Sequence, residues 1–197
     1  MQWMQRIKRF ARRFHREERG IVAVEAVIIA PLLIVGLFFS YEAYGLFRQQ
    51  SQREKATYTV ADILSRETAV VTDTYIDNIK RVFDMMAGTD DAQLRISVVR
   101  YHKNAGEGID EFDLRWSEVR GSGPLTPLTD AQVRKAHDTF PIMKDGEDLI
   151  YVESRGNYTS PVTTGYFNEN LLETRMFVIP RFVPQVCFTG ICVPGTS

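Results

Sequence analysis

The chain has few residues of the kinds that carry catalytic or metal chemistry, with three histidines and two cysteines in 197 residues. His15, His102 and His137 are far apart in the sequence. A Walker phosphate loop, a G-x-S-x-G motif and an H-E-x-x-H motif are all absent. The acidic pairs Asp90–Asp91 and Glu147–Asp148 lie near glycines of expected turns, as is typical of solvated loops. We therefore predict no enzyme activity, cofactor or metal site, with a membrane-tethered enzyme of unrecognised type as one alternative.

Positive and negative charges nearly balance in the whole chain, with 24 Lys and Arg against 25 Asp and Glu and a net charge of −1. The charge is unevenly divided, however. The first twenty residues hold seven cations and two anions, which gives them +5 and leaves −6 for the rest. A basic start and an acidic remainder indicate a cytoplasmic N-terminus and an exported C-terminus. The basic arm adjoins an apolar run and contains no nucleic-acid-reading module, so we predict contact with membrane lipid and no nucleic acid.

Charge is nearly absent from one stretch, Ile21 to Phe39, in which Glu25 is the single charged residue. Nineteen helical residues extend about 28 Å, close to the thickness of the hydrocarbon core of a bilayer. A carboxylate costs roughly 2.5 to 3.5 kcal/mol near the centre of a bilayer and less toward its edge, so Glu25 needs a partner. An ordinary secretory signal has a shorter apolar region and a small-residue cleavage site, which the sequence after Phe39 lacks. We predict a membrane-spanning helix.

The residues around this run resemble the processing site of type IV prepilins. A basic leader ends at Gly20, Ile21 follows, and Glu25 comes five residues after the glycine. The continuation AVEAVIIAPLLIVGL, from Ala23 to Leu37, is similar more narrowly to the TadE/TadF-like pseudopilins of tight-adherence (Flp) pilus systems. The resemblance implies that a membrane-embedded prepilin peptidase cuts between Gly20 and Ile21. It also implies that Glu25 pairs with the α-amine of a neighbouring subunit.

Two residues inside the apolar run are candidates for shaping the helix. Pro31 removes a backbone donor, and it either kinks the span or tunes its packing. Gly36 permits the close approach of another helix. Aromatic residues follow as far as Phe47, as at a membrane interface, and an amphipathic pattern then continues. The expected organisation is a basic cytoplasmic leader over 1–20, a transmembrane helix over 21–47, an amphipathic stalk helix over 48–68 and an exported domain over 69–197.

The exported domain has the pattern of an α+β fold. Gly88 is the stop signal of a helix that begins at Asp73. Phe112, Leu114 and Trp116 alternate with polar residues, which predicts one apolar strand face in a hairpin. The predicted elements are helices over 73–86 and 131–140 and strands over 94–101, 112–117, 148–154 and 171–180. With the long N-terminal helix, these give one or two short helices and about four antiparallel strands.

The two cysteines, Cys187 and Cys192, lie close together in the segment CFTGIC. An exported location permits a disulfide between them, free thiols are the alternative, and a metal site needs more ligands than the sequence supplies. By the entropy model a short loop stabilises less than a long one, so we expect the bridge to shape the C-terminal tip. The preceding MFVIPRFVPQVCF is also similar to endings in the pseudopilin family.

The resemblance implies a minor pseudopilin, because major pilins of the Flp type are much shorter than this chain. Its expected partners are the prepilin peptidase, other pilin and pseudopilin subunits and the inner-membrane pilus assembly platform. Its expected location is the bacterial inner membrane as a single-pass protein with a periplasmic C-terminal domain, and incorporation in a pilus stays open. The alternative is an uncleaved single-pass envelope anchor or sensor whose exported domain binds a partner.

Overall fold

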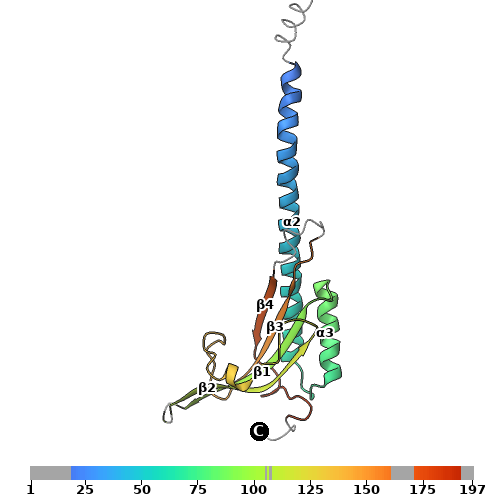
Figure 1. Cartoon of the computed structure of the whole chain (residues 1–197). Coiled ribbons are helices and arrows are strands. Elements are labelled where there is room, and N and C mark those ends of the chain that lie inside the picture. The colour runs from blue at the N-terminus through green and yellow to red at the C-terminus, as the bar shows by residue number, and fades with distance from the viewer. Residues whose placement is uncertain (1–18, 105, 107, 161–170, 192–197) are drawn as a thin grey trace, which may run out of the picture. The chain divides into compact units, whose positions relative to one another are not determined.

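The computed structural model describes residues 19–104, 106, 108–160 and 171–191 (Figure 1). Helix α2, Arg19–Ser65, is continuous through Pro31. The chain divides into two compact units after Tyr44, so that the first part of α2 belongs to an N-terminal unit and the rest of it to a head unit. Most of the leader predicted over 1–20 lies outside the described residues.

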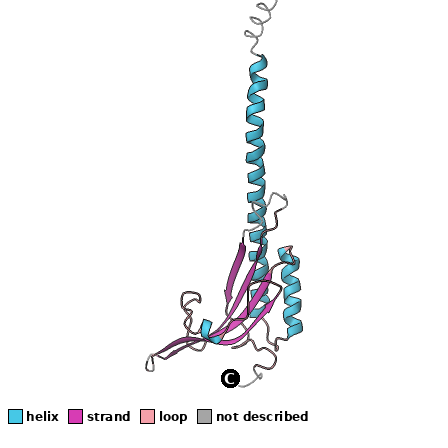
Figure 2. Cartoon of the chain, viewed as in Figure 1, coloured by secondary structure: helices cyan, strands magenta, loops and turns pink. Residues whose placement is uncertain are grey.

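The head unit contains a four-stranded sheet in the order β2-β1-β3-β4. All three neighbouring pairs are antiparallel. The strands are β1 Gln93–Asn104, β2 Ile109–Arg120, β3 Asp148–Asn157 and β4 Leu171–Val178 (Figure 2). The predicted α+β class and antiparallel sheet are confirmed, and the strand order places β2 and β4 at the two edges.

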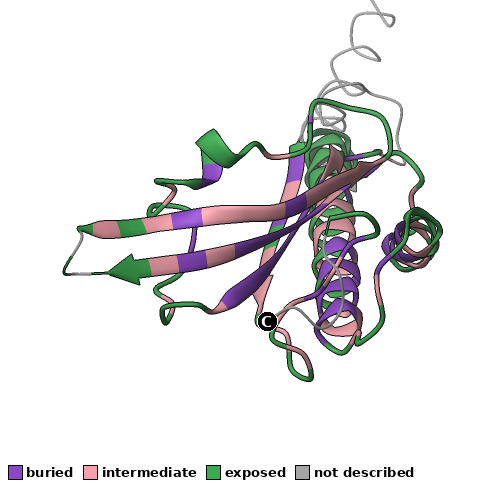
Figure 3. Cartoon of the chain, turned by 90° about the horizontal axis from the view of Figure 1, so that it is seen from below, coloured by how far each residue is buried: buried purple, intermediate pink, exposed green. Residues whose placement is uncertain are grey.

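The docked part of α2 and helix α3, Asp73–Ala87, pack against one face of the sheet (Figure 3). The Thr72 side chain caps α3 by accepting a hydrogen bond from the Tyr75 amide, and Gly88 ends it in the left-handed conformation, as the stop signal predicted. Both helices and several strands contribute to this first core. Its members include Ala56, Val60, Leu64, Ile76, Phe83, Leu94, Ile96, Val98, Ile150 and Val152.

The opposite face of the sheet holds a second core. Phe140 lies at its centre, with ring centroids 5.1 Å from Phe112 and 5.6 Å from Tyr151. Helix α4, Asp130–Val133, and the chain after it supply the covering residues. The buried members are Val99, Tyr101, Phe112, Val133, Phe140, Leu149 and Tyr151. The sheet is therefore buried on both faces along part of its length.

The register of β1 and β2 shows that the prediction of one shared face for Phe112, Leu114 and Trp116 is wrong. Val98 pairs with Trp116, but the next β1 residue pairs with Leu114, so Arg115 is the extra residue of a β-bulge. The extra residue changes the face of the sheet to which the side chains on either side of it point. Trp116 therefore joins the first core, whereas Phe112 joins the second. An alternating sequence does not reveal a bulge, because the partner strand defines the register.

The helix predicted over 131–140 is shorter than expected, because α4 covers only Asp130–Val133. Thr129 stands at its N-cap. Turns follow as far as Phe140, whose ring enters the second core. Pro141 disfavours helical backbone at the residue before it, and the residues just before Phe140 have low helix propensity. The predicted N-terminus of the helix is correct, and its predicted length is wrong.

The C-terminal segment returns to the stretch between α2 and α3. The Val71 amide donates to the Cys187 carbonyl at 2.8 Å. Trp116 Nε1 donates to the Val186 carbonyl at 2.7 Å, and the Trp116 and Phe188 ring centroids lie 5.4 Å apart. Val186 and Phe188 are both members of the first core. The segment is therefore part of the packed domain, which the sequence did not predict.

Candidate functional site

The N-terminal unit has an exposed apolar surface along α2. Large apolar side chains between residues 23 and 39 face outward, with Val27 73% exposed and Leu37 70% exposed. Within the described part of the chain, α2 is the one helix long and apolar enough to cross a membrane by length and composition, and none of its most apolar window is buried. A core helix of a soluble protein buries such side chains. Among the described residues nothing buries this surface, and by its length and composition the helix could anchor the chain in a membrane.

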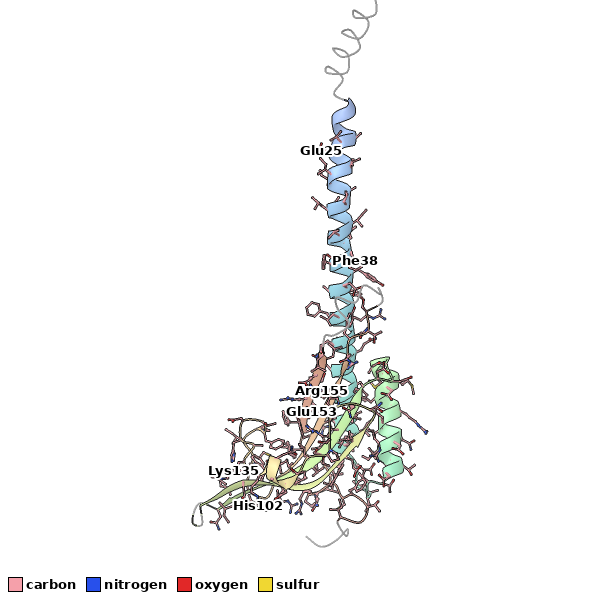
Figure 4. All side chains as sticks on the ribbon, viewed as in Figure 1. Glu25, Phe38, His102, Lys135, Glu153 and Arg155 are labelled. Atoms are coloured by element: carbon pink, nitrogen blue, oxygen red, sulfur yellow. The ribbon has the colours of Figure 1, made fainter. Side chains whose placement is uncertain are left out.

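Glu25 lies on this surface and is exposed (Figure 4). Gly20 and Ile21 also belong to α2. Ile21 and Glu25 are four residues apart, about 6 Å of rise and one helical turn, so the two positions lie on the same side of the helix. Ile28 and Ile29, one turn further along, are exposed apolar residues. The carboxylate is thus surrounded by apolar surface, which makes a partner for it necessary in a bilayer.

The two helix-shaping candidates also lie on this part of α2. Pro31 does not end the helix. A Cβ atom added at Gly36 would meet nothing within 4 Å. The Gly36 carbonyl accepts a hydrogen bond of 2.8 Å from the Ser40 hydroxyl, a bond within the helix. The surface at Gly36 has room for another helix, and the packing role of both residues stays a prediction.

The head unit contains a charged ladder that the sequence analysis missed, on the same sheet face as the second core. It consists of Arg95, Glu153, Arg155, Glu173 and Arg175. Glu153 is buried and accepts hydrogen bonds from Arg95 and, at 3.0 Å, from Tyr151 (Figure 4). Burial and the adjacent Glu153 carboxylate raise the pKa of Tyr151 to about 12. The pairing of β1, β3 and β4 brings these charges together, so no local motif could have found them.

A second buried carboxylate lies on the other sheet face. Arg100 Nε donates to Asp148 Oδ1 at 2.5 Å. Burial raises the pKa of Asp148, while the hydrogen bond and charge of Arg100 and the charge of Arg115 act in the opposite direction. Arg115 Nη2 also donates to Gln185 Oε1 at 3.0 Å. This network joins the C-terminal segment to the sheet, and its contacts are those of structural ion pairs.

The two head-unit histidines each lie near one aspartate. His102 Nε2 is 3.1 Å from Asp113, and His137 Nε2 is 3.5 Å from Asp110. All four side chains are at least one-third exposed, and they come from the β1–β2 hairpin and the turn after α4. Over the described ranges, no group of three or more His, Cys, Asp and Glu residues is placed to hold a metal ion. These pairs have the geometry of surface ion pairs.

Only one of the two cysteines, Cys187, lies within the described residues. Cys187 is disulfide-bonded. Its predicted partner, Cys192, lies outside the described residues. Because the Cys187 carbonyl accepts the Val71 amide, the bridge begins at a residue that is fixed to the core. The pairing itself stays a prediction.

The chain matches no protein-family model, no curated protein and no solved structure. The resemblance to pseudopilins therefore depends on the basic leader, the residues from Gly20 to Leu37 and the C-terminal segment alone.

Proposed function

We propose that the chain is a minor pseudopilin, anchored in the bacterial inner membrane, which a prepilin peptidase cuts after Gly20 and which is needed to assemble a tight-adherence pilus. The observation that carries this proposal is the exposed apolar surface of α2, which is described from Ala23 onward and includes Glu25. A helix with such a surface needs lipid before assembly and helices of other subunits afterwards. The prepilin peptidase, other subunits and the assembly platform are its proposed partners.

Glu25 gives the proposal a physical mechanism. Cleavage after Gly20 removes the basic arm and creates an α-amine on Ile21. The amine and the Glu25 carboxylate are each costly alone in hydrocarbon, and their pairing between neighbouring subunits recovers part of that cost. The new α-amine is on Ile21, four residues before Glu25, so the two groups lie one turn apart on the same side of α2. A pair formed between neighbouring subunits, by contrast with one within a single chain, sets the position of one subunit relative to the next.

The N-terminal residue of the protein tests this proposal. We would measure it by mass spectrometry of membrane fractions, with and without a co-expressed prepilin peptidase. The expected result is a peptidase-dependent start at Ile21. A start at Met1 in both samples, with the peptidase active on a control substrate, would favour the uncleaved anchor or sensor, since the apolar surface of α2 fits that function equally well.

Two substitutions separate cleavage from assembly. Gly20→Leu is expected to block processing, because a bulky side chain hinders close backbone approach in a protease cleft. Glu25→Val is expected to leave processing largely intact and to reduce pilus output, because the α-amine of the neighbour loses its partner. Leu37→Val, a conservative change on the same exposed surface, serves as the matched control. Normal pilus output from both test variants would contradict the mechanism.

A further inference from the structure

The bond that the proposed peptidase cuts lies inside a helix. α2 is α-helical from Arg19 onward, so Gly20 and Ile21 both have helical backbone. In an α-helix a carbonyl accepts a hydrogen bond from the amide four residues later, which for Gly20 is the Val24 amide. A hydrolase must polarise the carbonyl of the bond that it cuts, and it needs free space beside the carbonyl carbon. A carbonyl that is bonded to the next turn of its own helix, and covered by that turn, meets neither requirement.

The place of this turn along the apolar run makes its opening possible. The charged leader ends at Arg19, and the apolar run begins at Ile21. At such a boundary water can bind the backbone groups that opening frees, whereas each unpaired N–H or C=O group within the hydrocarbon is costly. Opening of the turn from Gly20 to Val24 therefore costs far less than opening of a turn near Val35, in the middle of the span.

The residues of this turn also weaken it. Gly20 has the lowest helix propensity of any residue except proline, because its unfolded backbone has the most freedom to lose. Ile21, Val22 and Val24 are β-branched, and the helix restricts their side chains at χ1. Four of the five residues from Gly20 to Val24 are thus weak helix formers.

We propose that the turn of α2 from Gly20 to Val24 opens before cleavage and that its low helix stability sets the cleavage rate, an inference that rests on the proposed function. Opening breaks backbone hydrogen bonds only. Hydrolysis then adds water to the Gly20 carbonyl carbon and breaks its bond to the Ile21 nitrogen, which leaves a carboxyl group on Gly20 and an amine on Ile21. When opening and closing are rapid, the cleavage rate at low substrate concentration is proportional to the open fraction.

Alanine and glycine at the same position test this inference, because both remove the valine side chain and they differ mainly in helix propensity. We would compare Val22→Ala with Val22→Gly, and Val24→Ala with Val24→Gly, using the full chain in detergent and purified prepilin peptidase. At each position we expect the glycine variant to be cut about fivefold faster than the alanine variant, because glycine raises the open fraction. Loss of a valine side chain that the peptidase recognises would instead slow both variants alike.

The matched control is Val35→Ala against Val35→Gly, the same comparison in a turn further along α2. These two variants should be cut at the same rate. Without peptidase, the amides of residues 21 to 24 should exchange hydrogen faster in the glycine variants at positions 22 and 24 than in the alanine variants. Equal cleavage of the alanine and glycine variants at both positions, or slower cleavage of the glycine variants, would overturn this inference alone. If a peptidase that is active on a control substrate never cuts the unchanged chain, the proposed function fails, and this inference fails with it.

Discussion

At the scale of single residues, the head unit depends on buried polar groups that satisfy one another across strands. Glu153 has almost no contact with water, and its carboxylate is held by Arg95 and by the Tyr151 hydroxyl. Loss of a partner is strongly destabilising for such a group, because the remaining charge or donor then stays buried and unpaired. Because Tyr151 belongs to this network, a change of pH that ionises its hydroxyl tests how much the network stabilises the fold.

The stability of the head unit should depend on alkaline pH through Tyr151. Its pKa is raised from 10 to about 12 by burial and by Glu153. Because the folded-state value lies above the unfolded one, the stabilisation is fully present below pH 10 and is lost as the pH rises toward 12. We expect Tyr151→Phe to lower the free energy of unfolding by about 1 kcal/mol at neutral pH, since Glu153 loses a donor. Between pH 10 and 12 the variant should lose stability less steeply than the wild type. Urea unfolding at several pH values measures both effects, and parallel pH profiles would contradict the assignment.

At the scale of elements, the docked part of α2 is fixed on the sheet by close approach at Gly156. Arg53 is buried against β3, and its Nη2 donates to the Asn157 carbonyl at 2.9 Å. Desolvation lowers the pKa of Arg53. A Cβ atom at Gly156 would lie 2.5 Å from Arg53 Nη1 and 3.1 Å from Ala92 Cα. A side chain at residue 156 would therefore require the Arg53 guanidinium or the backbone at Ala92 to shift.

Gly156→Ala is accordingly expected to destabilise the head unit by about 1 to 3 kcal/mol, the usual cost of overpacking. Adding Arg53→Met should recover part of the loss, because it removes the charged end that the new methyl group meets. Gly36→Ala is the matched control, since a Cβ there meets nothing within 4 Å. It should be neutral or slightly stabilising by up to about 1 kcal/mol. Chemical denaturation of the three variants measures these effects, and an unchanged Gly156→Ala protein would show that the contact at Gly156 relaxes freely.

At the scale of the head unit as a whole, the C-terminal segment joins parts of the chain that are far apart in sequence. Arg181 donates from its amide to the Ser65 carbonyl at 2.8 Å, and Val71 is bonded to Cys187. Val186 and Phe188 are buried as members of the first core. The end of α2, the segment before α3 and the C-terminal residues are therefore held in one packed structure.

Packing of this segment should matter more to stability than its disulfide. Phe188→Ala is expected to lower the free energy of unfolding by about 3 to 5 kcal/mol, because it removes a buried aromatic ring and leaves a cavity. Reduction of the disulfide at Cys187 should cost only about 2 kcal/mol if it closes the predicted short loop. Denaturation of the oxidised, reduced and variant proteins compares the two contributions. A larger loss on reduction than in Phe188→Ala would reverse this ranking.

The sequence by itself determined the local elements of this protein. The apolar run, the stop signal of α3 and the alternating strands depend on residues within a few positions of each other, so local patterns in the sequence revealed them. The motif from Gly20 to Glu25 is local for the same reason, and it made a candidate site identifiable before any fold was known. Whether that site is cut is a matter of chemistry in the membrane.

Only the tertiary structure decided which residues from distant parts of the chain meet. The bulge at Arg115 sends Trp116 and Phe112 to opposite cores, and only pairing with β1 makes it visible. The charged ladder and the packed C-terminal segment likewise join positions separated by dozens of residues. The physical reason is that strand register and long-range packing are set by the partner surface, on which the local sequence carries no information.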